Sequence, residues 1–232
     1  MTPRRTVAGT LAAALLLTGC AQSVDPIERM GRKAAQRVRH HHPAPAAAPP
    51  AGTAPTVPPV VDHIPTRDKV VFLTYDLDGD GGRPTDPAFL ALVRDSHLPL
   101  TVFTAGPGRH DSLGRLRALG ADLENRTFTH PALPGLGYVE QHTQICAQQN
   151  HLRSRFGRTP RLLRPPSGAY DATTLRAAAA CGIKAIVLWT PDPTTLHPGA
   201  IIRTTPSKSL TGRLLREIRH QGYEVAALSD YL

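Results

Sequence analysis

The sequence predicts an α/β fold, an imperfect (β/α) barrel of about seven parallel strands, between residues 67 and 232. Short apolar segments alternate with helical segments along this region, and such repeats imply parallel strands joined by right-handed crossovers. About seven strands in roughly 165 residues suit an incomplete barrel better than a complete eightfold one. A doubly wound open sheet is the alternative. Because no glycine-rich phosphate loop follows the first strand, a nucleotide enzyme is disfavoured.

Capping residues and glycines place the individual elements. Asp86 and Asp171 are expected N-caps, with Pro87 as the first residue of its helix. Gly120 and Gly157 are expected to follow helix ends. Strands are predicted at residues 70–75, 98–104, 121–125, 162–164, 183–189, 200–204 and 224–228, and helices at 87–94, 113–119, 138–156, 172–181 and 210–220.

The composition suggests an anionic neighbour. The 232 residues carry a formal net charge of +9, and the hydrophobic content of 41% is ordinary for a globular core. A basic chain has nucleic acid, lipid headgroups or an acidic envelope polymer as natural neighbours. The sequence has no zinc-finger spacing, aromatic RNA-binding signature or basic recognition helix. We therefore expect no nucleic-acid partner.

Residues 1–19 are predicted to be an export signal. Two arginines precede an apolar run that is too short to span a bilayer comfortably, and small residues follow. The run Leu-Thr-Gly-Cys ending at Cys20 resembles a bacterial lipoprotein signal, in which cleavage leaves the cysteine as a lipidated N-terminus. A plain signal peptide with a chance cysteine is the alternative. The expected localisation is exported and membrane-anchored on the extracytoplasmic face.

Residues 20–66 are predicted to be a tether. Its first part is basic, and residues 43–59 are rich in proline and alanine, a composition that stays extended and builds no core. The three histidines at 40–42 fit either a metal site or a solvated linker. If Cys20 carries lipid, Cys146 and Cys181 remain as a pair in an oxidising compartment, where they can form a disulfide.

Chemically active side chains fall at successive strand exits. Asp76 and Asp78 follow the first strand, residues 125–130 follow the third, Arg164 the fourth, and Trp189 with Asp192 the fifth. In a β/α barrel these ends share one face, so we expect these residues to converge. A solvated acidic turn is the alternative for the first exit.

Four stretches carry a resemblance to the polysaccharide deacetylases of the NodB homology family, over about residues 69–232. Thr-Tyr-Asp-Leu-Asp-Gly at 74–79 is similar to the family's Thr-Phe-Asp-Asp-Gly. Asn-Arg-Thr-Phe-Thr-His-Pro at 125–131 resembles its Asn-His-Thr-Trp-Ser-His-Pro. Leu-Arg-Pro-Pro-Ser-Gly-Ala-Tyr at 163–170 resembles its Phe-Arg-Pro-Pro-Tyr-Gly, and residues 221–228 resemble its closing strand.

The resemblance implies metal-assisted removal of an acetyl group from an N-acetylated sugar. The family's metal, usually zinc-like, sits on one carboxylate and two histidines and leaves a position open for water. A separate aspartate is the base, and a late histidine protonates the leaving amine. Asp76 matches the base, and His130 matches one metal ligand.

The chain departs from this pattern in the active positions. Leu77 stands where the metal-binding aspartate belongs, and Asp78 can substitute only if the backbone bulges by one residue. Arg126 replaces the first histidine of the pair, and Thr205 stands at the late histidine. Because a guanidinium has donors and no lone pair, it cannot bind zinc. We hypothesise that Arg126 occupies the cation's place and pairs with Asp76 or Asp78; the alternative is that it points to solvent.

Other residues have two open interpretations. Arg164 either orients Asp76, as the resemblance implies, or pairs at the surface. Trp189 either stacks on a sugar or belongs to the core. Tyr75 and Tyr170 either line the mouth and contact substrate or only pack.

Two functions remain open. The first is an envelope lipoprotein that hydrolyses N-acetyl amide bonds on a cell-envelope, peptidoglycan-like glycan with a zinc-like divalent metal. The second is a catalytically inactive glycan-binding or scaffold lipoprotein that uses the same groove without a cofactor. In both, the membrane partner is reached through lipidated Cys20.

Overall fold

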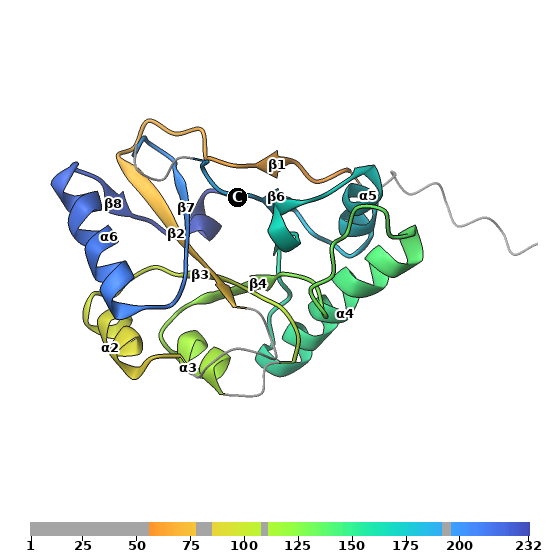
Figure 1. Ribbon diagram of the computed structural model, residues 1–232, viewed down its shortest axis with the longest axis horizontal. Coiled ribbons are helices and arrows are strands. Elements are labelled where there is room, and N and C mark those ends of the chain that lie inside the picture. Colours follow the sequence, from red (N-terminus) through yellow and green to blue (C-terminus); the bar gives the residue numbers. More distant parts are fainter. Residues whose placement is uncertain (1–55, 78–84, 108–110, 192–195) are drawn as a thin grey trace, which may run out of the picture. The chain divides into compact units, whose positions relative to one another are not determined.

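A curled sheet of parallel strands forms the centre of the fold (Figure 1). Within the described residues, seven strands follow one another in the order β1-β6-β5-β4-β3-β2-β7, and β8 pairs with β2 beside this path. From β2 to β6 each new strand adds on the same side, without the reversal of a doubly wound sheet. The predicted imperfect barrel is therefore confirmed. The strands are β1 Val60–Val61, β2 Val70–Leu77, β3 Thr101–Thr104, β4 Asp122–Asn125, β5 Leu162–Leu163, β6 Ala185–Val187, β7 Ile201–Thr204 and β8 Glu224–Val225.

The structure, a computed structural model, describes residues 56–77, 85–107, 111–191 and 196–232. These belong to one unit of the chain, Thr53–Leu232. The predicted export signal, Cys20, the histidine tract at 40–42, Asp78 and Asp192 lie outside the described residues. No helix in the part of the chain that is described is long and apolar enough to cross a membrane.

Helices cover the outer face of the sheet in two groups. In Figure 1, α2 and α6 lie together at one end of the sheet, and α4 and α5 lie together at the other; both pairs are in contact. Asp86 caps α2 by accepting a hydrogen bond from the backbone N–H of Ala88 at 2.9 Å. The left-handed Gly157, with φ +70°, ends α4. The helices are α2 Pro87–Asp95, α3 Ser112–Ala118, α4 Tyr138–Phe156, α5 Ala172–Ala180 and α6 Lys208–His220, with 3-10 turns η1 Pro166–Gly168 and η2 Leu228–Asp230.

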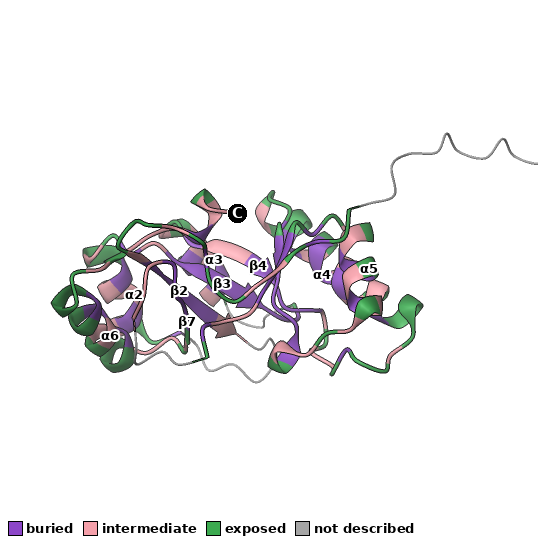
Figure 2. Cartoon of the chain, turned by 90° about the horizontal axis from the view of Figure 1, so that it is seen from above, coloured by how far each residue is buried: buried purple, intermediate pink, exposed green. Residues whose placement is uncertain are grey.

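Alternation along β2 separates the core into an outer and an inner layer. Val71, Leu73 and Tyr75 pack on the helix side with residues of α2, α3 and α6. Phe72 faces the inside of the curl, with apolar residues of β3, β5, β6, β7 and η2. A third cluster joins β5 and β6 to α4 and α5. Figure 2 shows buried residues along the strands and exposed residues on the outer helices. Because successive side chains point to opposite faces, Asp76 belongs to the inner face.

The folded unit begins earlier than the sequence indicated. The predicted tether ran to residue 66, but β1 pairs with β6, with Val60 opposite Ile186. Ile64 is buried, and its N–H donates to the carbonyl of Gly199 at 2.8 Å. The strand was missed because it has only two residues and directly follows two prolines of the proline-rich segment. Residues 60–66 are therefore corrected from tether to part of the folded unit.

A disulfide fastens α5 to α4. Cys146 lies in α4 and Cys181 follows α5, and the structure joins them across 35 residues of sequence. His142 lies one turn before Cys146, with Nε2 3.5 Å from its sulfur. These three residues form the one cluster of three potential metal-ligand side chains within the described residues. Because the two sulfurs are bonded to each other, the cluster serves as a covalent crosslink in this structure.

Candidate functional site

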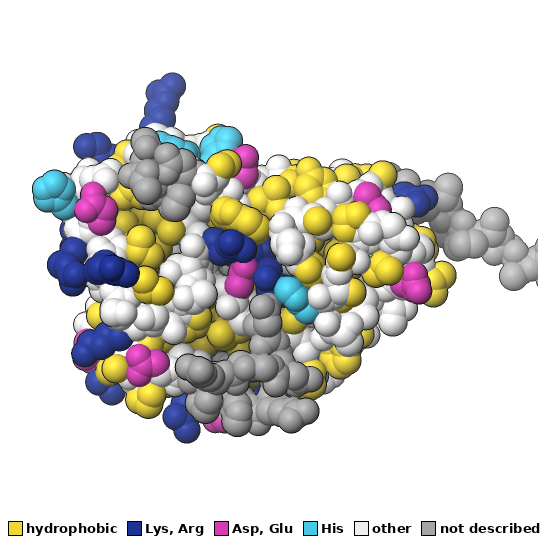
Figure 3. Space-filling view, viewed as in Figure 1, with side chains coloured by type: hydrophobic (Ala, Val, Ile, Leu, Met, Phe, Trp, Pro, Cys, Tyr) yellow, Lys and Arg dark blue, Asp and Glu magenta, His cyan; other side chains and the backbone are white. Residues whose placement is uncertain are grey.

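Asp76 lies near the end of β2, on the inner face, and three arginines surround it. Its Oδ1 is 3.0 Å from Nη1 of Arg164, and its Oδ2 is 3.1 Å from Nη1 of Arg126. Nη1 of Arg203 is 3.9 Å from Oδ2. The aspartate is largely buried, with 11% of its side chain exposed. In Figure 3, basic, acidic and histidine side chains gather near the middle of the face shown. We call Asp76, Arg126, Arg164 and Arg203 the arginine cluster.

Arg164 crosses the inside of the curl from β5 and binds two other strands. Its Nε and Nη2 donate to the carbonyls of Val187 and Leu188 at 3.2 and 2.9 Å. Its Nη1 donates to Thr74 Oγ1 at 2.8 Å and to Asp76. The side chain is fully buried over the ring of Phe103. Burial lowers the pKa of Arg164 to about 10, against the opposing effect of Asp76. Arg164 therefore orients Asp76 from within the protein, and surface pairing is excluded.

The loop after β4 holds Arg126 beside Asp76. Asn125 donates to the carbonyl of Ile145 and accepts from the N–H of Thr127, both at 2.8 Å. Thr127 has φ +67°, so the chain turns sharply just after Arg126. The arginine is 4% exposed. The predicted pairing with Asp76 is confirmed by the 3.1 Å distance, and the alternative that Arg126 points to solvent is wrong.

The remaining predicted ligand and acid positions do not assemble a metal site among the described residues. Leu77 packs against the outer apolar cluster, so its side chain is directed away from Asp76. His130 has φ +60° and a buried Nε2 atom. Thr205 is exposed directly after β7. Zinc sites need several nitrogen, sulfur or carboxylate ligands around one point. A guanidinium at 3.1 Å from the remaining carboxylate does not fit such a site. The ligand roles of His130 and Asp78 stay predictions.

Tyr75 is corrected from substrate contact to core. Its side chain is completely buried against Phe89, and its hydroxyl lies 3.1 Å from Oγ1 of Thr211 in α6. Burial raises the pKa of Tyr75 to about 12. The cause is the strand alternation that turns Asp76 inward and therefore turns Tyr75 outward.

Trp189, just after β6, is partly exposed and supports the arginine cluster. The guanidinium of Arg203 lies over its ring, with Cζ 3.9 Å from the centroid. Gly168 has φ +72°, and a Cβ there would lie 2.9 Å from the ring. Arg203 thus covers a face of the indole that sugar stacking would need. Tyr170 is exposed on the surface after η1, and its role as a substrate contact stays a prediction.

Arg203 is the functional candidate that the sequence analysis missed. It lies in β7, opposite Thr74 of β2 in the strand register. The signal was available, because Arg203 stands near the end of a predicted strand, as Asp76 does. No family motif marked the position.

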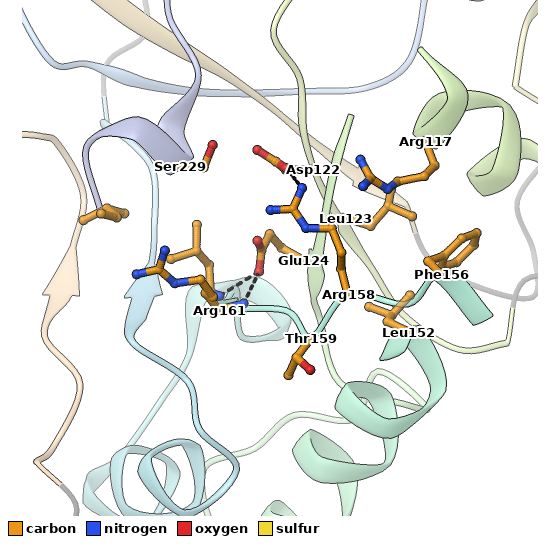
Figure 4. Close-up of a pocket in the computed structure, with 12 residues that line it drawn as sticks. Arg117, Asp122, Leu123, Glu124, Leu152, Phe156, Arg158, Thr159, Arg161 and Ser229 are labelled. Atoms are coloured by element: carbon orange, nitrogen blue, oxygen red, sulfur yellow. Dashed lines mark hydrogen bonds and ion pairs between the residues drawn. The ribbon is translucent and has the colours of Figure 1, made fainter. Parts of the chain in front are cut away.

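A small pocket of about 50 Å³ lies at the opposite end of the strands, near the start of β4 and β5 (Figure 4). Here Glu124 accepts hydrogen bonds from the backbone N–H groups of Arg161 and Leu162 at 2.8 and 2.7 Å. These bonds join β4 to the start of β5, where ladder pairing is limited to Asn125 and Leu163. Burial raises the pKa of Glu124 to about 7. Its role is therefore structural.

The raised pKa of Glu124 should make stability depend on pH. Folding disfavours the ionisation of Glu124, so the protonated carboxyl stabilises the folded state below pH 4.5. This stabilisation is lost as the pH rises to 7. We expect the free energy of unfolding of the wild type to fall, relative to Glu124→Gln, by about 3 kcal/mol over this range. Urea unfolding at a series of pH values measures the difference. The exposed Glu217→Gln is the control; equal pH profiles for Glu124→Gln and wild type would contradict the prediction.

Comparisons with known proteins identify the relatives of this chain. Residues 63–186 match the family model described as polysaccharide deacetylase. The chain is 44% identical to an uncharacterized protein of Streptomyces coelicolor over 97% of both chains. It is 30% identical to the chitooligosaccharide deacetylase of a Bradyrhizobium strain, over 53% of this chain and 57% of that protein.

The solved structures include a CE4 family pseudoenzyme from Bacillus anthracis. It has a TM-score of 0.65 and 20% identity, over 75% of this chain and 69% of that one. A mutant of that pseudoenzyme, described as having restored enzymatic activity, also has a TM-score of 0.65, at 22% identity over 75% and 71% of the two chains. At these identities the likeness establishes the fold.

Proposed function

The chain belongs to the polysaccharide deacetylase family, and from this premise we propose that it binds a cell-envelope glycan without deacetylating it. The observation that carries the proposal is the ion pair of 3.1 Å between Arg126 and Asp76. Both oxygens of the residue that matches the family's base are held by guanidinium groups. A charge-assisted contact on each oxygen competes with the water molecule that a general base must contact.

The altered positions support the same conclusion. Arg126 supplies positive charge where the family pattern has a metal ligand, and a guanidinium offers no lone pair. Leu77 faces the outer apolar cluster, and the hydroxyl of Thr205 is too weak an acid to protonate a leaving amine near neutral pH. The strands around Asp76 keep their arrangement, because Arg164, directly after β5, donates hydrogen bonds to residues of β6 and β2.

The cellular place of this function is proposed on sequence grounds. Residues 1–20 have the features of a lipoprotein signal, so we place the domain on the extracytoplasmic face of the membrane, anchored at Cys20. A peptidoglycan-like, N-acetylated glycan is the proposed partner, in line with the chitooligosaccharide deacetylase relative. Globomycin-sensitive processing and labelling with a fatty acid would test the anchor, and Cys20→Ala should abolish both.

A paired assay of binding and hydrolysis tests the function. We expect the full-length protein to cosediment with insoluble peptidoglycan or chitin and to release no acetate from N-acetylglucosamine oligomers, with or without added zinc or cobalt. Acetate is measured enzymatically. Acetate release that is abolished by Asp76→Asn would overturn the proposal and restore the deacetylase interpretation. Failure to bind any glycan would also overturn it.

A further inference from the structure

Within the described residues, one acid, Asp76, lies among the three arginines of the arginine cluster. One aspartate faces three arginines, so the formal charge of the four groups is −1 + 3 = +2. Charges in a partly buried, low-dielectric site are screened less than on an open surface. Asp76 already pairs with Arg126 and Arg164, so the charge of Arg203 at the site favours an anion and disfavours a cation.

Arg203 differs from Arg164 in the hydrogen bonds that its guanidinium donates. Arg164 is fully buried and uses Nε, Nη1 and Nη2 inside the protein. The side chain of Arg203 is 41% exposed, and its distance of 3.9 Å to Asp76 is too long for a hydrogen bond. In the described part of the chain, the side chain of Arg203 donates no hydrogen bond. Its guanidinium thus presents free donors to the mouth.

The indole ring of Trp189 holds the guanidinium of Arg203 in position at the site. Their 3.9 Å separation is that of a close cation–π contact. A planar guanidinium held in place forms paired hydrogen bonds to a carboxylate or phosphate with less loss of side-chain entropy. A neutral sugar hydroxyl cannot satisfy both donors or compensate the charge. The arrangement therefore suits an oxyanion.

A groove continues from Arg203 along β7 and α6. It has a volume of about 430 Å³, and Arg213, Leu210 and Leu214 of α6 form part of its wall. Glu217 also lines the groove, so with Arg203 and Arg213 the lining keeps a net positive charge. The leucines give an apolar surface that suits the carbon face of a sugar ring. An acidic sugar unit at Arg203 can thus have its neighbouring unit in the groove.

We propose that this site selects glycans that carry an oxyanion, a carboxylate or a phosphate on a sugar, and that Arg203 binds that group. The proposal rests on the proposed glycan-binding function and names its substrate class. The favoured partner is an acidic envelope polymer rather than a neutral chitin-like chain.

Calorimetric titration of the full-length protein with matched oligosaccharides tests the selection. The ligands are an oligogalacturonide for the carboxylate, a sugar-phosphate oligomer for the phosphate, and an N-acetylglucosamine oligomer of equal length as the neutral reference. We expect one or both acidic ligands to bind at least about tenfold more tightly than the neutral one, since a charge-assisted pair of hydrogen bonds is lost without the anion. Whichever acidic ligand binds more tightly identifies the source of the anion.

Substitutions localise the effect to Arg203. Arg203→Gln should weaken acidic ligands about tenfold or more and leave the neutral ligand nearly unchanged. Arg203→Lys keeps the charge without the planar pair of donors and should fall between. Arg176→Gln is the matched control, because Arg176 is also exposed and lies over an aromatic ring, that of Tyr138, but in α5. We expect this control to bind like the wild type.

The outcomes separate this inference from the proposed function. Equal binding of acidic and neutral ligands overturns the inference and leaves glycan binding standing. A preference that Arg203→Gln and Arg176→Gln reduce equally reflects overall charge and also overturns it. Inorganic phosphate that competes as well as the sugar phosphate shows an ion site without glycan recognition, which overturns it too. Absence of binding to all three oligosaccharides removes the proposed function itself.

Discussion

Replacing Arg164 with methionine should lower the free energy of unfolding by about 3–5 kcal/mol, the cost of breaking a buried ion pair and leaving buried acceptors without a donor. Arg164 is fully buried, and it bonds the carbonyls of Val187 and Leu188, the hydroxyl of Thr74 and the carboxylate of Asp76. Methionine fills much of the space but satisfies none of these acceptors. The strands β2, β5 and β6 would lose their common polar link on the inner face.

Chemical denaturation with guanidinium chloride measures this loss. Arg158→Met is the control, because Arg158 is 63% exposed and pairs with Asp122 at 3.5 Å. Such an exposed ion pair is expected to contribute about 1 kcal/mol or less to the free energy of unfolding. Arg164→Lys should be intermediate, since one charge remains but not the fork of donors. A loss of less than about 1 kcal/mol in Arg164→Met would show that the cluster does not stabilise the sheet.

Helices were predicted well because their ends carry local chemical signals. The bounds expected for α4, residues 138–156, are those observed, and Gly157 ends the helix in a left-handed conformation. Asp86 and Asp171 cap α2 and α5 as expected. A cap or a C-terminal glycine acts within one turn, so the sequence nearby is sufficient to locate it.

Strand ends were predicted less well because a partner strand decides them. The segment 183–189 was expected as a strand, and β6 covers only Ala185–Val187. The strand β8 pairs with Val70 and Val71 alone, because β7 occupies the next positions of β2 from Phe72 onward. These strand ends depend on pairing with the neighbouring strand, so the residues of the strand itself do not indicate them.

Part of the site followed from the sequence and part did not. The convergence of Asp76, Arg126 and Arg164 at the strand exits was expected, and the structure brings them together. Tyr75 was assigned to the mouth although the alternation Val71, Leu73, Tyr75 already indicated the outer face. Arg203 required the register of β7 against β2, which only the folded sheet supplies.

Converting Arg126 to histidine should raise the affinity of the site for zinc. Arg126→His removes the cation next to Asp76 and places a second imidazole four residues before His130, the spacing by which one loop turn supplies two ligands. We expect zinc to bind this variant at least about tenfold more tightly than the wild type, a gain of about 1.4 kcal/mol or more. Competition with a zinc chelator measures it, with His40–His42 substituted so that this tract cannot contribute.

Two further variants distinguish the cause of the gain. Arg126→Gln removes the charge without adding a ligand, so it should not gain tight zinc binding. Leu77→Asp added to Arg126→His tests the register directly, because Leu77 packs on the outer face and its replacement gains metal affinity only if the strand end can turn inward. A wild-type protein that already holds stoichiometric zinc, and loses it in His130→Ala, would show that Arg126 has not replaced the metal. In that case the ion pair of Arg126 and Asp76 would have to open for the metal to enter.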